Sequence, residues 1–264
     1  MSLLRIIISK SPKIWNDEFR LGRWIMEAIT LRESAEQMYQ SNEYFNNNPT
    51  WDVEDSPWKA SQILKIIQKN DLHPNSICEI GCGAGEILHQ LFLQMPDNRT
   101  FVGYEISPHA FELCQQRKTE RLDYKLENVI EDTSAHFDLV MAIDVLEHVE
   151  DYFGFLRNLR NKGEYKLLHI PLDMSVQVVF RMSPLLRSRK KVGHIHYFSK
   201  DTAIATLQDT GYEIIDYFYT PGLDLPNRPI KALLARLPRK LGFLINRDIT
   251  VRLFGGYSLM VLAK

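Results

Sequence analysis

A short glycine-rich turn between a predicted strand and a predicted helix most constrains how this chain can fold. Residues 79–87 read EIGCGAGEI, with glycine at every second position from Gly81 to Gly85. An apolar run, Ser76–Cys78, precedes the turn, and a helical pattern, Glu86–Leu93, follows it. Glycine permits positive φ and has no Cβ to block a ligand. Strand, glycine turn and helix in this order predict a site where the backbone closely approaches a nucleotide-like ligand.

Two predicted strands that follow the turn are each followed directly by an acidic residue, as such a site requires. Thr100–Tyr104 is a short β-prone run, and Glu105 comes directly after it, about 20 residues beyond the glycine turn. A carboxylate at the end of this second strand can accept both ribose hydroxyls of a nucleotide. Further along, Phe137–Ile143 has the apolar pattern of a strand, and Asp144–His148 leads from it towards a helix. We therefore expect acidic side chains from several strand ends to meet at one site.

The exact glycine pattern separates classes of nucleotide site. A dinucleotide fingerprint, G-x-G-x-x-G, uses its third glycine to pack the helix against the sheet, whereas this chain has Glu86 there. Glu79 followed by G-x-G-x-G resembles motif I of the class I S-adenosylmethionine-dependent methyltransferases. The sequence FDLV…VLEHV resembles the fourth strand and the following loop in the small-molecule, methyltransferase type 11/12-like branch of this family. The resemblance spans Ser76–Asp151 and continues more weakly to the C-terminus.

This resemblance implies S-adenosylmethionine as cofactor, S-adenosylhomocysteine as product, and methyl transfer to a small-molecule acceptor by in-line displacement. In the family the glycine loop lies against the methionine half of the cofactor, and the acid of the motif binds its amino group. The usual adenine-contacting pattern after the third strand is missing, and Glu127 and Asn128 are the nearest matches. The implied cofactor-binding residues are Glu79, Gly81, Cys82, Gly83, Gly85, Glu105, Ile106, Glu127, Asn128, Asp144, Val145, Leu146, Trp58 and Lys59.

Three histidines are the candidate catalytic bases, because histidine titrates near neutral pH. A base matters where the acceptor is a hydroxyl, and less where it is an amine or a carbanion. His148 follows the fourth strand, so it is either a base or a helix-start residue that contacts cofactor. His194 and His196 lie two residues apart in VGHIHYF. We predict no metal site, because no third ligand is evident beside this pair.

The order of the elements predicts an α/β fold. Predicted strands at 76–80, 100–105, 122–127, 137–143, 165–170, 212–219 and 256–263 alternate with helices. This alternation indicates a doubly wound, seven-stranded, mostly parallel, Rossmann-like sheet with helices on both faces. The family resemblance adds an antiparallel last strand. We predict an N-terminal helical extension or cap at 1–50 and a methyltransferase domain at 51–264, with lid insertions at about 173–192 and 221–250.

Composition limits the partners and the compartment. The net charge of −1 gives no overall basic field for nucleic acid, and three cysteines do not suggest a disulfide framework. Radical chemistry with the same cofactor needs C-x-x-x-C-x-x-C, and Gly85 occupies the third cysteine position. No secretory signal or membrane span is evident, which predicts a cytoplasmic protein. The sequence does not predict the oligomeric state.

The two insertions are basic, and their meaning stays open between three interpretations. Arginine and lysine there could bind an anionic acceptor such as a sugar, a lipid head group or another metabolite. Residues 229–245, PIKALLARLPRKLGFLI, resemble a basic amphipathic helix that could make peripheral contact with an anionic membrane. The third interpretation is a solvated, charged helix face.

Three other functions compete with methyl transfer. The NAD-dependent oxidoreductase is disfavoured by Glu86 and by the VLEHV match. A non-catalytic protein of the methyltransferase fold could keep the cofactor site. A nucleic-acid methyltransferase is disfavoured by the charge balance and by the absence of an Asn/Asp-Pro-Pro-Tyr/Phe motif, since Asp144-Val-Leu-Glu147 follows the fourth strand.

Overall fold

The structure, a computed structural model, describes residues 38–39, 42–131, 135–226 and 236–264. The chain divides into two units, Met1–Ser34 and Ala35–Lys264, and every described residue belongs to the second. Most of the predicted N-terminal extension therefore lies outside the described residues. The described remainder of that extension belongs to the same unit as the sheet, and the division at residue 50 stays a prediction.

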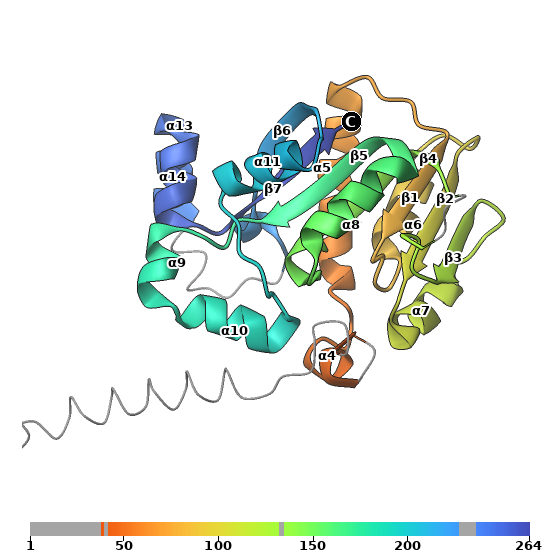
Figure 1. The fold of residues 1–264 in the computed structure, drawn as a ribbon, viewed down its shortest axis with the longest axis horizontal. Coiled ribbons are helices and arrows are strands. Elements are labelled where there is room, and N and C mark those ends of the chain that lie inside the picture. The colour runs from red at the N-terminus through yellow and green to blue at the C-terminus, as the bar shows by residue number, and fades with distance from the viewer. Residues whose placement is uncertain (1–37, 40–41, 132–134, 227–235) are drawn as a thin grey trace, which may run out of the picture. The chain divides into compact units, whose positions relative to one another are not determined.

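A seven-stranded sheet forms the centre of the described unit (Figure 1), in the order β3-β2-β1-β4-β5-β7-β6. β7 runs antiparallel to both of its neighbours, and all the other pairs are parallel. The predicted fold is confirmed, and each predicted strand agrees with the structure within two residues at each end. The strands are β1 (Ser76–Ile80), β2 (Thr100–Glu105), β3 (Leu122–Leu126), β4 (Phe137–Ile143), β5 (Gly163–Pro171), β6 (Ile214–Pro221) and β7 (Tyr257–Ala263).

Helices cover both faces of the sheet because its strands are apolar on both sides. In β4, Leu139 and Met141 pack in one buried cluster, whereas Val140 and Ala142 pack in the other. The first cluster includes α5, α6 and α7, and the second includes α8 and α11; α8 lies in front of the sheet in Figure 1 and α5 behind it. The helices that cover the sheet are α5 (Ser56–Lys69), α6 (Glu86–Gln94), α7 (Pro108–Cys114), α8 (Tyr152–Leu159) and α11 (Lys200–Asp209).

Both predicted insertions contain short helices. The first holds α9 and α10 between β5 and α11, and the second holds η5, α13 and α14 between β6 and β7. α14 packs against both α9 and α13, so the two insertions meet each other. Their bounds, with those of the remaining short helices, are α4 (Asn42–Asn47), η1 (Val53–Asp55), η2 (Gln115–Arg117), η3 (Leu146–His148), η4 (Arg160–Lys162), α9 (Val176–Arg181), α10 (Ser183–Val192), η5 (Gly222–Asp224), α13 (Arg236–Ile245) and α14 (Arg247–Phe254).

A search of the described helices for membrane spans found none that combines the necessary length with sufficient apolar character. Residues 227–235, part of the predicted amphipathic segment, lie outside the described ranges. The predicted cytoplasmic location stays a prediction.

Candidate active site

A cavity of about 870 Å³ lies at the carboxyl ends of the parallel strands, where open α/β sheets bind their ligands. Its walls come from the turn after β1, the ends of β2 and β3, and the loop after β4, with α5 and residues of both insertions beside them. Gly85, Leu146 and His196 do not line it. The predicted site residues that do line it are Trp58, Lys59, Glu79, Gly81, Cys82, Gly83, Glu105, Ile106, Glu127, Asn128, Asp144, Val145, His148 and His194.

Glu105 holds the glycine turn from the neighbouring strand. Its Oε2 accepts a hydrogen bond from the Gly83 amide at 2.8 Å, and its Oε1 accepts from the Ile106 and Ser107 amides, each at 2.8 Å. The side chain is buried, and burial raises the pKa of the carboxyl despite these three bonds. A carboxylate offers about four lone-pair positions, so roughly one remains for a ligand, on Oε2.

The three glycines of the turn have different roles, although all have positive φ. A Cβ on Gly85 would lie 2.5 Å from the Tyr124 ring, so this glycine is required by packing. A Cβ on Gly83 would meet only the Trp51 ring, at 3.7 Å, and would project beside the cavity. Gly83 is therefore the glycine of the turn at which packing against the protein leaves room for a side chain.

Glu79 is a buried carboxylate with unused hydrogen-bonding capacity. It lies in β1, is 1% exposed, and lines the cavity. Its Oε2 has no hydrogen-bond partner among the described residues. Burial raises the pKa of its carboxyl to about 8, although the nearby Lys59 charge opposes that rise. A positively charged ligand group would satisfy this oxygen.

Asp144 stands at the centre of a chain of polar contacts after β4. Its Oδ2 pairs with the Lys59 ammonium at 2.8 Å, and its Oδ1 contacts His169 Nδ1 at 2.6 Å. His169 Nε2 in turn contacts the Thr220 hydroxyl at 2.8 Å. Burial acts to raise the pKa of Asp144, but His169 and Lys59 hold it well below its usual range. Asp144 has φ of 56°, a backbone conformation that few non-glycine residues adopt, which commonly marks functional sites.

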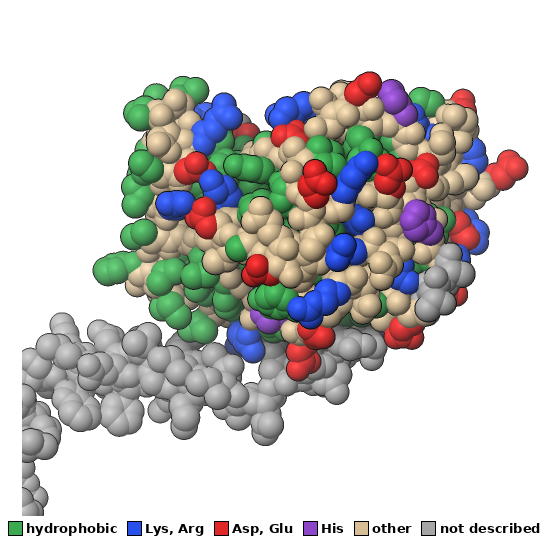
Figure 2. Space-filling view, turned by 45° about the horizontal axis from the view of Figure 1, so that its top comes forward, with side chains coloured by type: hydrophobic (Ala, Val, Ile, Leu, Met, Phe, Trp, Pro, Cys, Tyr) green, Lys and Arg blue, Asp and Glu red, His purple; other side chains and the backbone are tan. Residues whose placement is uncertain are grey.

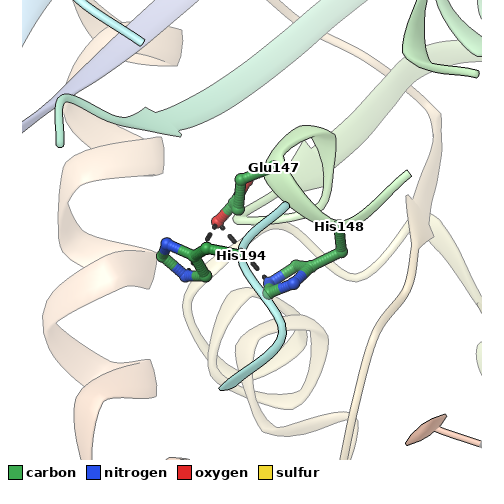
Figure 3. A group of neighbouring side chains, drawn as sticks. All are labelled: Glu147, His148 and His194. Carbon is green, nitrogen blue, oxygen red and sulfur yellow. Dashed lines mark ion pairs between the residues drawn. The ribbon is translucent and has the colours of Figure 1, made fainter. Parts of the chain in front are cut away.

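Glu147, His148 and His194 form a second polar group on the cavity wall (Figure 3). Glu147 Oε1 lies 3.7 Å from His148 Nε2 and 3.9 Å from His194 Nε2. Burial and the neighbouring His194 lower the pKa of His148 to about 3, so His148 is neutral at physiological pH and a weak base. No metal site is predicted from the sequence because no third ligand is evident beside His194 and His196. The structure groups His194 with Glu147 and His148 instead, so that argument does not apply to this group.

His196, the third candidate base, lies apart from this group. Its Nε2 faces the Glu150 carbonyl oxygen at 3.2 Å, and its ring packs against Tyr152. The catalytic roles proposed from the sequence for the three histidines stay predictions.

The cavity also contains residues that sequence reasoning missed. Tyr39, Tyr44 and Trp51 form an aromatic wall, with the Tyr44 ring centroid 4.6 Å from that of Tyr39 and 4.5 Å from that of Trp51. His169 lies in β5, opposite Ile143 of β4 and near the carboxyl end of its strand, so its place near the end of a predicted parallel strand could have identified it. The aromatic wall had no comparable pattern in the sequence.

A Rossmann-like sheet with one antiparallel strand, a glycine turn and a cavity at its carboxyl edge defines a class of nucleotide-cofactor-binding α/β proteins. The chain belongs to the methyltransferase domain family, which matches residues 57–217. The predictions of fold, of methyltransferase class and of S-adenosylmethionine as cofactor are confirmed at the level of this family. Comparison with curated protein sequences gives no match.

Solved structures share the fold at low identity. The N-methyltransferase NodS from Bradyrhizobium japonicum WM9, in complex with S-adenosyl-L-homocysteine, is 15% identical with a TM-score of 0.56, covering 88% of this chain and 98% of that one. Magnesium protoporphyrin IX methyltransferase from Synechocystis PCC 6803, also with bound S-adenosylhomocysteine, is 14% identical with a TM-score of 0.53, covering 96% and 99%. The cyclopropane synthase MmaA2 from Mycobacterium tuberculosis is 17% identical with a TM-score of 0.55, covering 89% and 100%.

Proposed function

We propose that this protein transfers a methyl group from S-adenosylmethionine to a small, anionic acceptor bound in the cavity. The observation that carries the proposal is the pair of buried carboxylates, Glu79 and Glu105, beside one glycine turn. Glu79 would pair with the ammonium of the methionine moiety, and Glu105 Oε2 would accept from a ribose hydroxyl. Glu127 and Asn128, at the end of β3, would lie beside the adenine.

Methyl transfer requires little of the protein beyond alignment of the acceptor with the methyl group and the sulfur. The sulfonium is a good leaving group, so the acceptor attacks the methyl carbon in line while the carbon–sulfur bond breaks and its electron pair passes to sulfur. Holding the reactants in that geometry can supply about 7–11 kcal/mol of barrier reduction. Lys59 and Asp144 form an ion pair with each other. They would therefore position the methionine moiety of the cofactor rather than act as proton donor or acceptor for the substrate.

Calorimetry tests the cofactor assignment directly. We expect S-adenosylhomocysteine and S-adenosylmethionine to bind with micromolar dissociation constants, which is a binding free energy of about −8 kcal/mol. NAD⁺ serves as the matched negative ligand. Binding of NAD⁺ with no heat from either methyl-donor ligand would support the oxidoreductase instead. Binding of cofactor without methyl transfer to any acceptor in a panel of metabolites would support the non-catalytic alternative.

The anionic character of the acceptor is supported by a smaller hollow of about 310 Å³ between β6 and α13. Tyr219, Phe243 and Tyr257 give it aromatic walls, and Arg239 and Lys240 supply positive charge beside the single carboxylate of Asp224. Arg239 Nε has no hydrogen-bond partner among the residues described. Gly222 and Leu225, in the same turn as Asp224, line the main cavity, so the hollow adjoins it.

An amphiphilic acceptor taken from a lipid surface is the second candidate, favoured by exposed apolar side chains. Figure 2 shows hydrophobic side chains gathered at the left, on the side where Figure 1 places α9, α13 and α14. Phe180, Leu244 and Ile245 are 89%, 83% and 88% exposed. Basic side chains on α9 and α10 accompany them, a combination typical of interfacial helices.

We therefore expect the protein to sediment with vesicles of phosphatidylcholine and phosphatidylserine, and less with phosphatidylcholine alone. Replacing Phe180, Leu244 and Ile245 together by serine should weaken this binding by more than about tenfold, because each buried apolar side chain contributes about 1.5–3 kcal/mol. Leu93→Ser, an exposed position on α6, is the matched control and should bind as the wild type does. Equal sedimentation of the triple variant would exclude this surface as the membrane contact.

A further inference from the structure

Three acceptor atoms converge on one point of the cavity wall. They come from Glu147, His148 and His194, each of which offers one ligand atom within 4.8 Å of the other two. Glu147 Oε1 lies 3.7 Å from His148 Nε2 and 3.9 Å from His194 Nε2. Glu147 and His148 belong to η3, directly after β4, whereas His194 follows α10 in the first insertion. Hydrogen bonds from the Ile195 and His196 amides to the Glu147 carbonyl oxygen, at 2.9 and 3.1 Å, tie the two segments together.

The partners of the opposite ring nitrogens indicate the tautomer of each histidine. His194 Nδ1 faces the Asp173 carboxylate at 2.7 Å, so Nδ1 carries the hydrogen and Nε2 presents a lone pair. The Tyr39 hydroxyl donates to the Val192 carbonyl oxygen, so it accepts from His148 Nδ1 at 2.9 Å. His148 Nε2 therefore also presents a lone pair towards Glu147.

Glu147 adds a buried carboxyl group to these two lone pairs, and it supplies negative charge when it ionises beside a cation. Its side chain is 1% exposed, and neither carboxylate oxygen has a hydrogen-bond partner in the described part of the chain. An unpaired buried carboxylate is costly, and three acceptors facing one another without a donor repel. Such an arrangement is stable when a cation stands between the three atoms.

We propose that Glu147, His148 and His194 bind a divalent first-row transition-metal ion, such as Zn²⁺ or Mn²⁺. Two imidazoles and one carboxylate are a donor set typical of catalytic sites that keep a position open for water or substrate. Ligand atoms of a tetrahedral zinc site lie about 3.4 Å apart, so the 3.7 and 3.9 Å separations need to shorten by a few tenths of an ångström. The separation between the two histidines, which is within 4.8 Å, has to shorten by up to about 1.4 Å. Asp173 and Tyr39 orient the two rings, as outer-shell groups do in metal sites.

The role of the ion rests on the proposed function, because the three ligands line the same cavity as the glycine turn. A bound ion would hold an oxygen of the acceptor and lower the pKa of its hydroxyl, whose proton would pass to water in the open cavity. The resulting oxygen nucleophile would form the bond to the methyl carbon as the carbon–sulfur bond breaks, leaving S-adenosylhomocysteine. The acceptor would then be methylated on oxygen.

Metal titration of the full chain, stripped of metal and carrying no histidine tag, tests the site. Calorimetry with ZnCl₂ and MnCl₂ should show one ion per chain, and the melting temperature should rise with ion concentration. His194→Ala and Glu147→Gln should weaken binding more than about 100-fold, and Asp173→Asn by about 10–100-fold. His196→Ala is the matched control, because it removes a nearby imidazole outside the group, and it should bind metal as the wild type does.

Glu147→Gln also separates loss of the site from loss of the fold. It keeps the size of the side chain and removes an unpaired buried charge, so without metal its melting temperature should equal or exceed that of the wild type. No ion bound, or equal binding by Glu147→Gln, would overturn the proposal and indicate that a proton occupies the group instead. The same samples titrated with S-adenosylhomocysteine distinguish this failure from failure of the cofactor site.

Discussion

Glu105→Ala is expected to weaken S-adenosylhomocysteine binding by at least about 100-fold, close to 3 kcal/mol, given that a hydrogen bond to a charged group contributes about 1.5–3 kcal/mol. Two effects combine in this loss. The ribose would lose the carboxylate acceptor that we propose for it, and the amides of Gly83, Ile106 and Ser107 lose the group that now holds them. Calorimetry gives the dissociation constant, and far-ultraviolet circular dichroism confirms that the variant is folded.

Glu105→Gln keeps part of the second effect. Its single carbonyl oxygen can accept from the Ile106 and Ser107 amides, but its Nε2 then faces the Gly83 amide and cannot accept from it, so the turn loses one of its three bonds together with the charged acceptor. Binding should weaken by about tenfold or more. Glu112→Ala removes an exposed carboxylate from α7 and should bind as the wild type does. Wild-type affinity in Glu105→Ala would place the cofactor elsewhere in the protein.

The parts of the fold that the sequence predicts well are those set by local chemistry. β1 and β4 pack on both faces because helices cover both, so each appears as a short, mostly apolar run in which Glu79 and Asp138 are the internal charged residues. Gly81, Gly83 and Gly85 all have positive φ, which is the conformational reason for their spacing. Strand ends and the turn between them could therefore be predicted within two residues.

The residues predicted to bind the cofactor lie together because they are at one edge of the sheet. Glu79, Glu105 and Asp144 lie at or beside the carboxyl ends of three adjacent parallel strands, so knowing the strand order suffices to bring them together. Gly85 and Leu146 share the same motifs without facing the cavity. Gly85 contacts Tyr124, and Leu146 is buried in the core beneath α8, since a motif fixes the path of the backbone more firmly than the direction of each side chain.

The group formed by Glu147, His148 and His194 could not be predicted from the sequence in the same way. Glu147 and His194 lie far apart in sequence, and their proximity depends on the path of the first insertion after α10. That path has no periodic pattern, and it is fixed by backbone hydrogen bonds to the Glu147 carbonyl oxygen and by the His194–Asp173 contact. Contacts between residues so far apart in the sequence cannot be recognised from local sequence patterns.

Glu79→Gln is expected to move stability and cofactor affinity in opposite directions. The carboxyl of Glu79 has a pKa of about 8 in the folded protein, against an ordinary value of 4.5. Between these pH values the folded state keeps a proton that the unfolded state has lost, so its contribution to stability is full below pH 4.5 and is lost as the pH rises to about 8. The loss approaches about 1.4 kcal/mol per pH unit.

Glutamine cannot ionise, so this pH dependence should be absent from the variant. Urea unfolding at several pH values should show the variant gaining on the wild type as the pH rises through this window, and the difference between the two proteins cancels the titration of all other groups. Parallel pH profiles for the two proteins would contradict the assignment. Cofactor affinity should change the other way, because we propose that an ionised Glu79 pairs with the ligand ammonium. Loss of that charged contact should weaken S-adenosylhomocysteine binding by about 10–100-fold at the pH where the empty variant is the more stable protein. These two results together would show that Glu79 serves binding. Its ionised carboxylate would destabilise the cofactor-free protein and strengthen cofactor binding, whereas stability alone would favour glutamine at this position.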